Sequence, residues 1–222
     1  MLGPSTRLVA LLGHPVAHSL SPRMQNAAFA ARGLDWAYVG LDVVPEQLET
    51  AVRGLAAAGF AGANVTAPHK VAVARIVGSE LPSVNTLVGL KGYSTDAAIL
   101  EGLSAERPVI IGDGGAAAAF RHALPQARVF SRRGDWPPDV RDADLVVHAT
   151  SVRDEVLVEV GEGQTLIDLP YPRTATAGAA AAAGARVLDG LDVLLAQGAA
   201  SFELWTGIPA PVEVMYTALR NG

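Results

Sequence analysis

The chain contains no cysteine, so disulfide bridges, thiolate metal sites and thiol nucleophiles are all excluded. Aromatic residues are also scarce, at 5% of the 222 residues. The N-terminal apolar run, Leu8 to Leu12, stops at Gly13 and falls far short of the roughly 20 residues that a membrane-spanning helix needs. The N-terminus also lacks the layout of a signal peptide. We therefore expect a cytoplasmic protein without a membrane partner.

Positive charge is too sparse and too scattered for binding to a nucleic-acid backbone. The formal net charge is -5, and the seventeen Lys and Arg residues form no runs. Half of the residues are apolar, and Ala, Gly and Pro are frequent, which suits α/β layers joined by tight turns. A chain of this length holds one large or two small domains. We expect no nucleic-acid partner, and either a monomer or a homodimer.

The first hundred residues alternate between strand and helix patterns. Predicted strands are 8–12, 36–43, 61–65 and 84–90, and predicted helices are 22–32, 45–58 and a shorter one after Pro68. Ser21 before Pro22 is a helix-start signal, in which the hydroxyl caps the helix and proline occupies the first turn. A turn is predicted at Lys91-Gly92. Strand, helix, strand, helix, strand indicates a mostly parallel sheet.

The pattern restarts at Arg107 and indicates a second αβ unit. Predicted strands are 109–111, 127–130, 144–149, 165–168 and 186–188, and predicted helices are 116–124, 175–183, 192–200 and 211–219. Only ten residues separate Arg133 from Asp144, and they include Pro137-Pro138. A crossover between parallel strands needs about a dozen residues. We therefore expect this connection to cross as an irregular loop without a helix.

A glycine turn follows the first strand of the second unit. Gly112-Asp113-Gly114-Gly115-Ala116 leaves a strand and opens a helix, where bare backbone amides can bind a pyrophosphate. Gly112 would make the turn, and Gly114 would let the backbone approach a phosphate. Such a turn also occurs in αβ folds without this function. Asp113 would repel the pyrophosphate unless its side chain points away.

The end of the next strand favours NADP over NAD. An NAD site places an acidic residue about 20 residues past the glycine turn, whereas this chain has Ser131-Arg132-Arg133. Two guanidinium groups behind a hydroxyl match a 2′-phosphate in charge and in bidentate geometry. The alternative is a pair of solvated arginines, partly neutralised by Asp135.

Polar side chains also cluster at strand ends in the first unit. Ser19 and Ser21 lie two positions apart and face the same side of an extended backbone. Because Ser21 is explained as the helix cap, Ser19 is left for a ligand carboxylate. The segment from Asn64 to Lys70 ends a strand and turns into a helix, which puts amide, hydroxyl and ammonium groups at the carboxyl edge of the sheet. A lone Lys is more often a surface charge.

Together these segments resemble the shikimate dehydrogenase family, over the chain from about residue 9 onward. The matching motifs occur in the family's order. They are Ser-x-Ser-Pro at 19–22, Asn-Val-Thr-x-Pro-x-Lys at 64–70, Val-Asn-Thr at 84–86, Thr-Asp at 95–96, the glycine turn at 112–116, Ala-Thr-Ser at 149–151, Asp-x-x-Tyr at 168–171 and Gln-x-x-x-Ser-Phe at 197–202. The resemblance implies NADP-dependent, reversible reduction of 3-dehydroshikimate to shikimate, a step towards the aromatic amino acids.

The resemblance also implies roles for individual residues. Lys70 and Asp96 would be the catalytic pair, with Lys70 beside the reacting oxygen, although Asp96 is equally explained as the cap of a following helix. The implied substrate-binding residues are Ser19, Ser21, Asn64, Thr66, Asn85, Tyr171 and Gln197. The implied cofactor-binding residues are Gly112, Asp113, Gly114, Gly115, Ala116, Ser131, Arg132, Arg133, Thr150, Leu169 and Gly190. No metal is implied.

The fold class expected from motifs and resemblance is α/β with two domains. A mostly parallel αβ substrate domain would span 1–97, completed by 191–222, and a shortened Rossmann-type NADP domain would span 98–190. Phe202 and Trp205 would pack in the first domain's core. The residues that depart from the family's usual ones are Ser94, Ala97, Asp113, Ser131 and His148, the last standing where the family has Asn. The shortened loops predict reduced NADP affinity or stability.

Three other readings remain open at this level. One is a quinate and shikimate dehydrogenase with relaxed cofactor use, against which Arg132 and Arg133 argue. Another is a non-catalytic paralogue that senses a ring acid or nucleotide, supported by the trimmed loops and Asp113, although mere binding does not need both Lys70 and Asp96. The last is an unrelated αβ nucleotide-binding protein, which leaves the polar motifs of the first unit unexplained.

Overall fold

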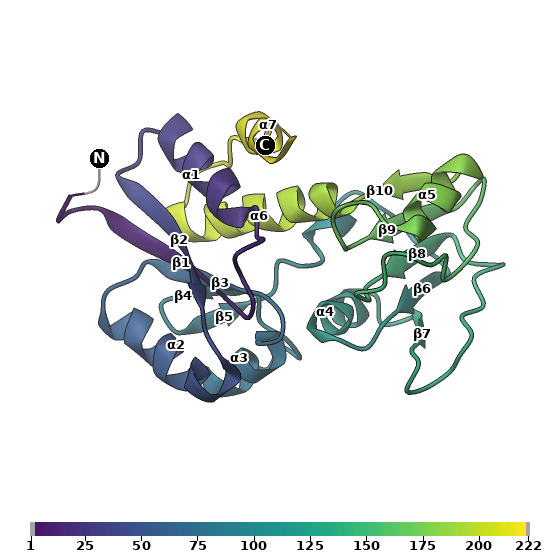
Figure 1. Ribbon diagram of the computed structural model, residues 1–222, viewed down its shortest axis with the longest axis horizontal. Helices are drawn as coiled ribbons and strands as arrows, with labels where there is room; N and C mark the ends of the chain where they lie inside the picture. The colour runs from purple at the N-terminus through teal and green to yellow at the C-terminus, as the bar shows by residue number, and fades with distance from the viewer. Residues whose placement is uncertain (1–2, 221–222) are drawn as a thin grey trace. The chain divides into compact units, whose positions relative to one another are not determined.

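The computed structural model describes residues 3–220 and divides into two compact units (Figure 1). Unit 1 consists of the chain up to Thr95 together with the chain from Leu195 onward. Unit 2 is the intervening segment, Asp96–Leu194. Each unit is built on its own five-stranded sheet.

The sheet of unit 1 is parallel on one side and antiparallel on the other. Its strands are β1 (Arg7–Gly13), β2 (Trp36–Asp42), β3 (Gly62–Val65), β4 (Thr86–Val88) and β5 (Lys91–Tyr93), in the order β2-β1-β3-β4-β5. β1 pairs in parallel with β2 and β3, whereas β4 and β5 run antiparallel to their neighbours. Because Leu12 is opposite both Leu41 and Val65, the carboxyl ends of these three strands share one edge.

The turn predicted at Lys91-Gly92 is wrong, because both residues belong to β5. The chain turns instead at Gly89 and Leu90, where Gly89 has a φ of +56°. Glycine adopts this left-handed conformation at little steric cost. Gly92 serves a packing purpose, since a Cβ placed there would lie 2.7 Å from Val84 Cγ2.

Helices cover both faces of the sheet of unit 1 (Figure 1). They are α1 (Ser21–Ala31), the 3-10 turn η1 (Pro45–Gln47), α2 (Leu48–Ala57), α3 (Lys70–Ile76), α6 (Gly190–Thr206) from Leu195 onward, and α7 (Val212–Arg220). Apolar side chains of α2 and α3 pack on one face with Ala10 and Leu12. On the other face Phe202 stacks on Phe29 at 5.5 Å between ring centroids. Phe202 and Trp205 are buried, which confirms them as core residues.

The sheet of unit 2 is entirely parallel, with the order β10-β9-β8-β6-β7. Its strands are β6 (Pro108–Ile111), β7 (Arg128–Phe130), β8 (Leu145–His148), β9 (Thr165–Asp168) and β10 (Arg186–Leu188). Alternate residues face opposite sides: Val109 and Ile111 pack with α5 (Ala175–Ala182), and Ile110 packs with α4 (Gly115–Ala123). A 3-10 turn, η2 (Ala98–Leu100), precedes β6.

The expectation that β7 connects to β8 without a helix is confirmed. Residues 131–144 are all described and contain only turns and irregular backbone. The loop still contributes to the core, because Val140 and Ala143 are buried against the same face as α5. Val158 and Val160, from the equally irregular connection between β8 and β9, join them. Loop-borne apolar side chains thus fill space that a crossover helix covers in longer αβ units.

Candidate active site

Ser19 and Ser21 lie at the start of α1, and neither is its N-cap. α1 begins at Ser21 with Leu20 as its N-cap, and no side chain of the described chain caps it. Ser19 Oγ instead accepts a hydrogen bond from the Ser21 amide at 3.2 Å. The assignment of Ser21 as the hydroxyl cap is therefore wrong. The backbone turns one residue earlier than the Ser-Pro signal suggests, and Ser21 keeps its hydroxyl out of the cap.

Asn64, in β3, is the centre of a buried hydrogen-bond network. Its Oδ1 accepts from the Tyr38 hydroxyl at 2.8 Å, and its Nδ2 donates to the Asn85 carbonyl at 3.1 Å. The same nitrogen lies 3.0 Å from both Thr86 Oγ1 and Ser201 Oγ. Asn64 was predicted to contact substrate. In this structure its amide group joins β2, β3, β4 and α6 to one another.

Asn85 extends this network to the residue before Asp96. Its Nδ2 donates to Thr95 Oγ1 at 2.9 Å, and its Oδ1 accepts from the Thr95 amide at 2.7 Å. Thr95 Oγ1 in turn lies 3.1 Å from Ser201 Oγ. The backbone entering Asp96 is thus held by a side chain of another predicted site residue. The network's Thr86, Thr95 and Ser201 belong to three of the family motifs, yet sequence reasoning assigned them no role.

Asp96 is buried, with 7% of its surface exposed, and the division between the two units falls directly before it. The 3-10 turn that follows has Ala97 as its N-cap, and no described side chain caps it. The alternative explanation of Asp96 as a helix cap is therefore wrong. Asp96 is thus a buried acidic side chain at the first position of unit 2.

Thr66 and Lys70 follow the carboxyl end of β3. The Thr66 amide donates a hydrogen bond to the Leu12 carbonyl oxygen at 2.8 Å. Lys70 is the first residue of α3 and is half-buried, and its carbonyl accepts from the Val84 amide at 3.0 Å. Between them His69 is buried, with Nε2 2.7 Å from the Val43 carbonyl oxygen. His69, unassigned from sequence, anchors the turn that presents Lys70.

The other two predicted substrate residues come from later segments. Gln197 lies half-buried in α6, where its carbonyl accepts from Ser201 Oγ at 2.9 Å. α6 packs closely on α1 here, since a Cβ on Gly198 would lie 2.2 Å from Met24 Cε. Tyr171 follows β9 in unit 2 and is half-buried. Six of the seven predicted substrate residues therefore belong to unit 1, and Tyr171 belongs to unit 2.

The glycine turn of unit 2 has the local geometry that sequence predicted. Gly112 has a φ of +130°, and a Cβ there would lie 2.6 Å from the Ala149 carbonyl oxygen, so only glycine fits. Gly114 is the extended N-cap of α4, and no described atom lies within 4 Å of the place its Cβ would take. Ala117, within α4, is fully buried against the sheet. The space beside Gly114 lets a phosphate group approach the start of this helix.

The two arginines predicted to bind a 2′-phosphate both face carboxylates. Arg132 Nη2 forms an ion pair with Glu155 Oε1. Arg133 Nε lies 3.7 Å from Asp113 Oδ2. Asp113 therefore directs its charge towards an arginine, which reduces the repulsion expected for a pyrophosphate. Ser131 precedes the two arginines. Its backbone carbonyl oxygen closes a tight turn by accepting a hydrogen bond from the Gly134 amide at 3.0 Å.

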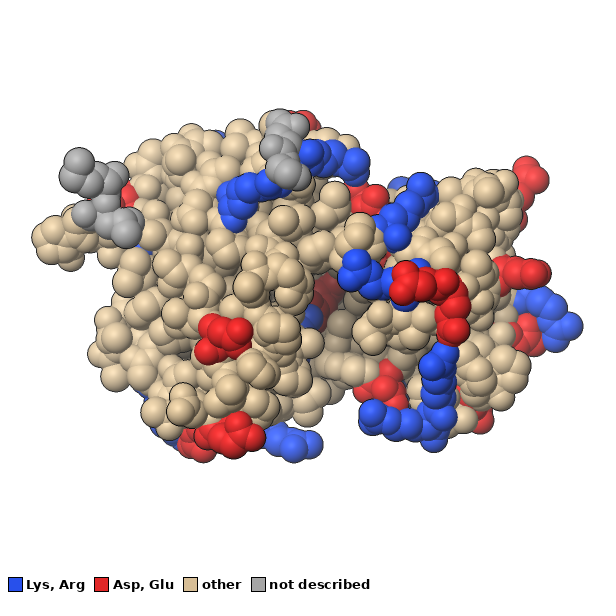
Figure 2. Space-filling view, viewed as in Figure 1, with Lys and Arg blue, Asp and Glu red and all other residues tan. Residues whose placement is uncertain are grey.

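A hollow of about 420 Å³ lies beside Arg132. It is lined by Arg132, Ser151, Val152, Arg153, Asp154 and Glu155. Figure 2 likewise shows acidic and basic side chains next to one another rather than a patch of one sign. The loop after β8 thus adds Arg153 to the predicted phosphate site, but it also adds the carboxylates of Asp154 and Glu155. Sequence reasoning did not foresee Glu155 at this position.

The remaining cofactor candidates lie at the ends of β8, β9 and β10. Thr150 Oγ1 is 2.7 Å from His148 Nε2, and His148 Nδ1 is 2.6 Å from Asp168 Oδ1. The Leu169 amide donates to the His148 carbonyl at 3.0 Å. Gly190 has no room for a side chain, since a Cβ would lie 2.2 Å from the Pro170 carbonyl oxygen. The backbone alone therefore lines this position.

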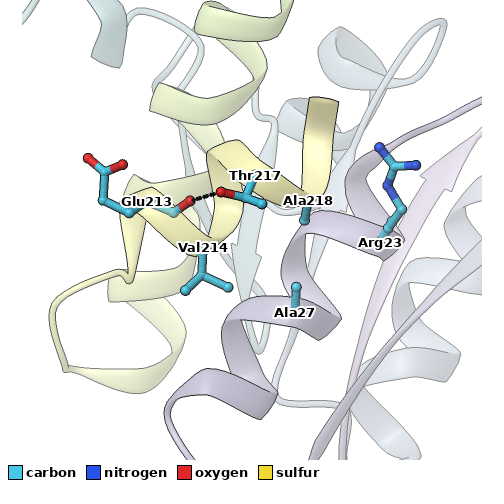
Figure 3. A pocket seen from close by; sticks show the side chains of 6 residues that line it. All are labelled: Arg23, Ala27, Glu213, Val214, Thr217 and Ala218. Atoms are coloured by element: carbon cyan, nitrogen blue, oxygen red, sulfur yellow. Dashed lines mark hydrogen bonds between the residues drawn. The ribbon is translucent and has the colours of Figure 1, made fainter. Parts of the chain in front are cut away.

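A second hollow lies away from these strand ends, between α1 and α7 (Figure 3). It measures about 450 Å³, and Arg23 and Glu213 lie at its opposite ends. Among the described residues nothing bonds Nε or Nη2 of Arg23, although both atoms are buried.

Residues 3–220 contain no cluster of three potential metal ligands from His, Asp and Glu. Within the same range, every helix is too short or too polar to cross a bilayer.

Two family models match the chain. The shikimate dehydrogenase substrate binding domain matches residues 11–86, and the shikimate 5′-dehydrogenase C-terminal domain matches residues 190–220. A shikimate dehydrogenase (NADP+) of Moorella thermoacetica is 42% identical over 276 aligned positions, which cover 98% of this chain and 94% of the relative. Because this chain has only 222 residues, the alignment leaves gaps in it, as expected for shortened loops.

Solved structures share the same two-unit architecture. The shikimate dehydrogenase of Aquifex aeolicus is 30% identical, with a TM-score of 0.89 and full coverage of both chains. The shikimate 5-dehydrogenase of Thermus thermophilus, solved in complex with NADP(H) and shikimate, is also 30% identical. Its TM-score is 0.82, and the match covers 96% of this chain and 98% of that one.

Proposed function

This chain belongs to the shikimate dehydrogenase family, and we infer that it catalyses the reversible, NADP-dependent reduction of 3-dehydroshikimate to shikimate. It is an oxidoreductase of the aromatic amino acid precursor pathway that uses NADP(H). The observation that carries the inference is the position of Lys70. It starts α3 directly after the carboxyl end of β3, on a turn anchored by the buried His69.

Unit 1 is proposed to bind the substrate. Ser19 and Ser21 at the start of α1 would bind the ring carboxylate, and the hydroxyl of Ser21 is not used as a helix cap. Thr66 and Gln197 would contact the ring hydroxyls. Asn64 and Asn85 are also proposed to bind substrate. Their buried network would in addition hold the other contact residues in place. Tyr171 of unit 2 is assigned to the substrate by family resemblance.

Lys70 and Asp96 are proposed to handle the proton and the charge. During reduction NADPH supplies the hydride. The carbonyl oxygen of the substrate gains negative charge as its double bond is broken, and the Lys70 ammonium stabilises that charge and donates the proton that makes the hydroxyl. In the reverse direction Lys70 takes the hydroxyl proton. Asp96 would favour the charged ammonium and orient it.

Unit 2 is proposed to bind the cofactor. The pyrophosphate would lie at the start of α4, beside Gly114 and Gly115. Arg132 and Arg133, with Ser131, would bind the 2′-phosphate after separating from Glu155 and Asp113. That exchange supports the expectation of weakened NADP binding. A nanomolar dissociation constant for NADP would contradict it.

The cytoplasm is the proposed location of the enzyme.

The test is the absorbance change of NADP+ with shikimate at alkaline pH, for the native chain and for Lys70→Ala. We expect kcat in the variant to fall by two or more orders of magnitude, as for loss of a general acid-base group. Lys91→Ala is the matched control, because Lys91 is the one other lysine in the sequence and is exposed above Tyr93. Its activity should equal that of the native chain.

Parallel reactions with quinate and with NAD+ separate the alternatives. Comparable rates with either would indicate relaxed specificity. Measurable shikimate binding without turnover under any of these conditions would refute catalysis and favour a ligand sensor.

A further inference from the structure

Hydrogen-bonded polar side chains join β8, β9 and the loop that follows β8. The parallel register sets His148 opposite Asp168. Both side chains are fully buried, and His148 Nδ1 lies 2.6 Å from Asp168 Oδ1. His148 Nε2 lies 2.7 Å from Thr150 Oγ1. The His148 imidazole thus links Asp168 to Thr150.

In the tautomer with its proton on Nδ1, His148 donates to the Asp168 carboxylate, and Nε2 accepts the proton of the Thr150 hydroxyl. Thr150 Oγ1 also accepts from the Val152 amide at 3.1 Å. A hydroxyl has one donor site and two acceptor sites. Thr150 therefore has a single acceptor site left, and a ligand there must itself donate.

The position of Thr150 indicates which part of the cofactor it meets. Its Cγ2 lies 3.5 Å from the place where Gly112 would carry a Cβ, so it borders the glycine turn. β8 and β7 flank β6 on opposite sides. If the 2′-phosphate lies at Arg132 after β7 and the pyrophosphate at the turn, the nicotinamide half extends to the β8 side.

We propose that His148 is a positioning residue that holds the Thr150 proton inward, so that Thr150 Oγ1 accepts a hydrogen bond from a neutral donor on the nicotinamide half of NADP. The donor is the carboxamide nitrogen or a hydroxyl of the nicotinamide ribose. A negatively charged acceptor at the same place is disfavoured. The inference rests on the proposed NADP-dependent function.

Equilibrium binding without turnover tests it, with three ligands. NADP+ carries both donors, nicotinic acid adenine dinucleotide phosphate has a carboxylate in place of the carboxamide, and 2′,5′-ADP lacks the nicotinamide half. Thr150→Val should weaken NADP+ about fivefold, the effect of one hydrogen bond of about 1 kcal/mol, and leave 2′,5′-ADP unchanged. Thr150→Ser, which keeps the hydroxyl, should bind as the native chain does.

His148→Asn keeps an N–H for Asp168 but is too short to reach Thr150. We expect it to weaken NADP+ relative to 2′,5′-ADP about as much as Thr150→Val does. If the donor is the carboxamide, both variants also lower the preference for NADP+ over the carboxylate analogue. If the donor is a ribose hydroxyl, both variants weaken the two dinucleotides equally.

Two results would overturn the inference. One is an unchanged ratio of NADP+ to 2′,5′-ADP affinity in Thr150→Val. The other is a His148→Asn variant that melts at a lower temperature and binds all three ligands more weakly in step, because that pattern marks a purely structural role. A native chain that binds none of the three ligands would instead refute the proposed function, and this inference with it.

Discussion

Glu155 forms an ion pair with Arg132, which is proposed to bind the 2′-phosphate. The ion pair joins two side chains that are more than half exposed, so it contributes roughly 0.5 kcal/mol at most and is easily exchanged. Glu155→Gln removes the competing charge beside the proposed 2′-phosphate site. We expect NADP+ and 2′,5′-ADP to bind about twofold more tightly in this variant. Calorimetric titration measures the change.

NAD+ serves as the control ligand, because it lacks the 2′-phosphate and its affinity should stay the same. Glu159→Gln is the matched control variant, since Glu159 is also exposed but does not line the hollow beside Arg132. An equal gain for NAD+ would show that Glu155 does not act on the 2′-phosphate.

Among the secondary structure elements, the carboxyl end of β1 is packed closely against Thr66, the residue that follows β3. A Cβ on Gly13 would lie 2.4 Å from Thr66 Cγ2. Gly13→Ala should therefore displace Thr66, one of the proposed substrate contacts, and raise the KM for shikimate about tenfold with a smaller effect on the KM for NADP+. Steady-state kinetics with each substrate varied in turn measures both constants.

Gly54→Ala is the control for this substitution. Gly54 lies within α2, and no described atom is within 4 Å of the place of its Cβ. Alanine there should leave both KM values unchanged and stabilise the chain by about 0.5–1 kcal/mol. If Gly13→Ala behaved in the same way, the proposed role of Thr66 would be wrong.

Asp144 ties the start of β8 to the segment before β6. Its carboxylate accepts from the amides of Glu106 at 2.6 Å and Arg107 at 3.0 Å. Burial acts to raise the pKa of Asp144, but these amide bonds outweigh it and hold the pKa below its ordinary value of 3.8. A lowered folded-state pKa means stabilisation that is present above the unfolded-state pKa and is lost as pH falls through the folded-state pKa.

Asp144→Asn should therefore cost about 1 kcal/mol at neutral pH, and the difference from the native chain should shrink steadily below pH 3.8. Urea unfolding at a series of pH values gives the free energies. Glu162→Gln, at an exposed carboxylate, is the control and should show little difference at any pH. A cost that stays constant down to about pH 2 would contradict the assignment.

The positions of strands and helices were the feature predicted most accurately from the sequence. Strand and helix patterns are local, so all but one of the strands appeared near their expected positions, and the helix missing between β7 and β8 followed from chain length alone. The exception was β5, where Gly92 looked like a turn residue. Its true role depends on Val84, which packs against it in the folded sheet. The absence of a Ser21 cap likewise depends on where the backbone bends.

At the scale of the whole molecule, the network around Ser201 joins segments that are far apart in sequence. Its Oγ bonds to Asn64, 137 residues away, and lies 2.8 Å from Thr86 Oγ1. Ser201→Ala would leave buried hydroxyls of Thr86 and Thr95 short of a partner. We expect a loss of about 1–3 kcal/mol in the free energy of unfolding and a lower kcat/KM, because the backbone entering Asp96 loosens.

Thr217→Ala is the matched control. Thr217 Oγ1 donates to the Glu213 carbonyl four residues earlier, as Ser201 Oγ does to Gln197, but Thr217 is exposed and lines the hollow between α1 and α7 (Figure 3). It should change the free energy of unfolding by less than about 0.5 kcal/mol. Denaturant unfolding and steady-state kinetics on both variants provide the comparison. Equal effects would show that the network has no special role.

Patterns in the amino-acid sequence predicted the α/β class, the order of the elements, the glycine turn and the family resemblance, because each depends on residues close together in the chain. Which polar groups meet became clear from the folded structure. Glu155 faces Arg132, His148 joins Asp168 to Thr150, and Ser201 closes the network around Asn64. These contacts depend on strand register and on helix packing across tens to more than a hundred residues, and no local pattern in the sequence encodes them.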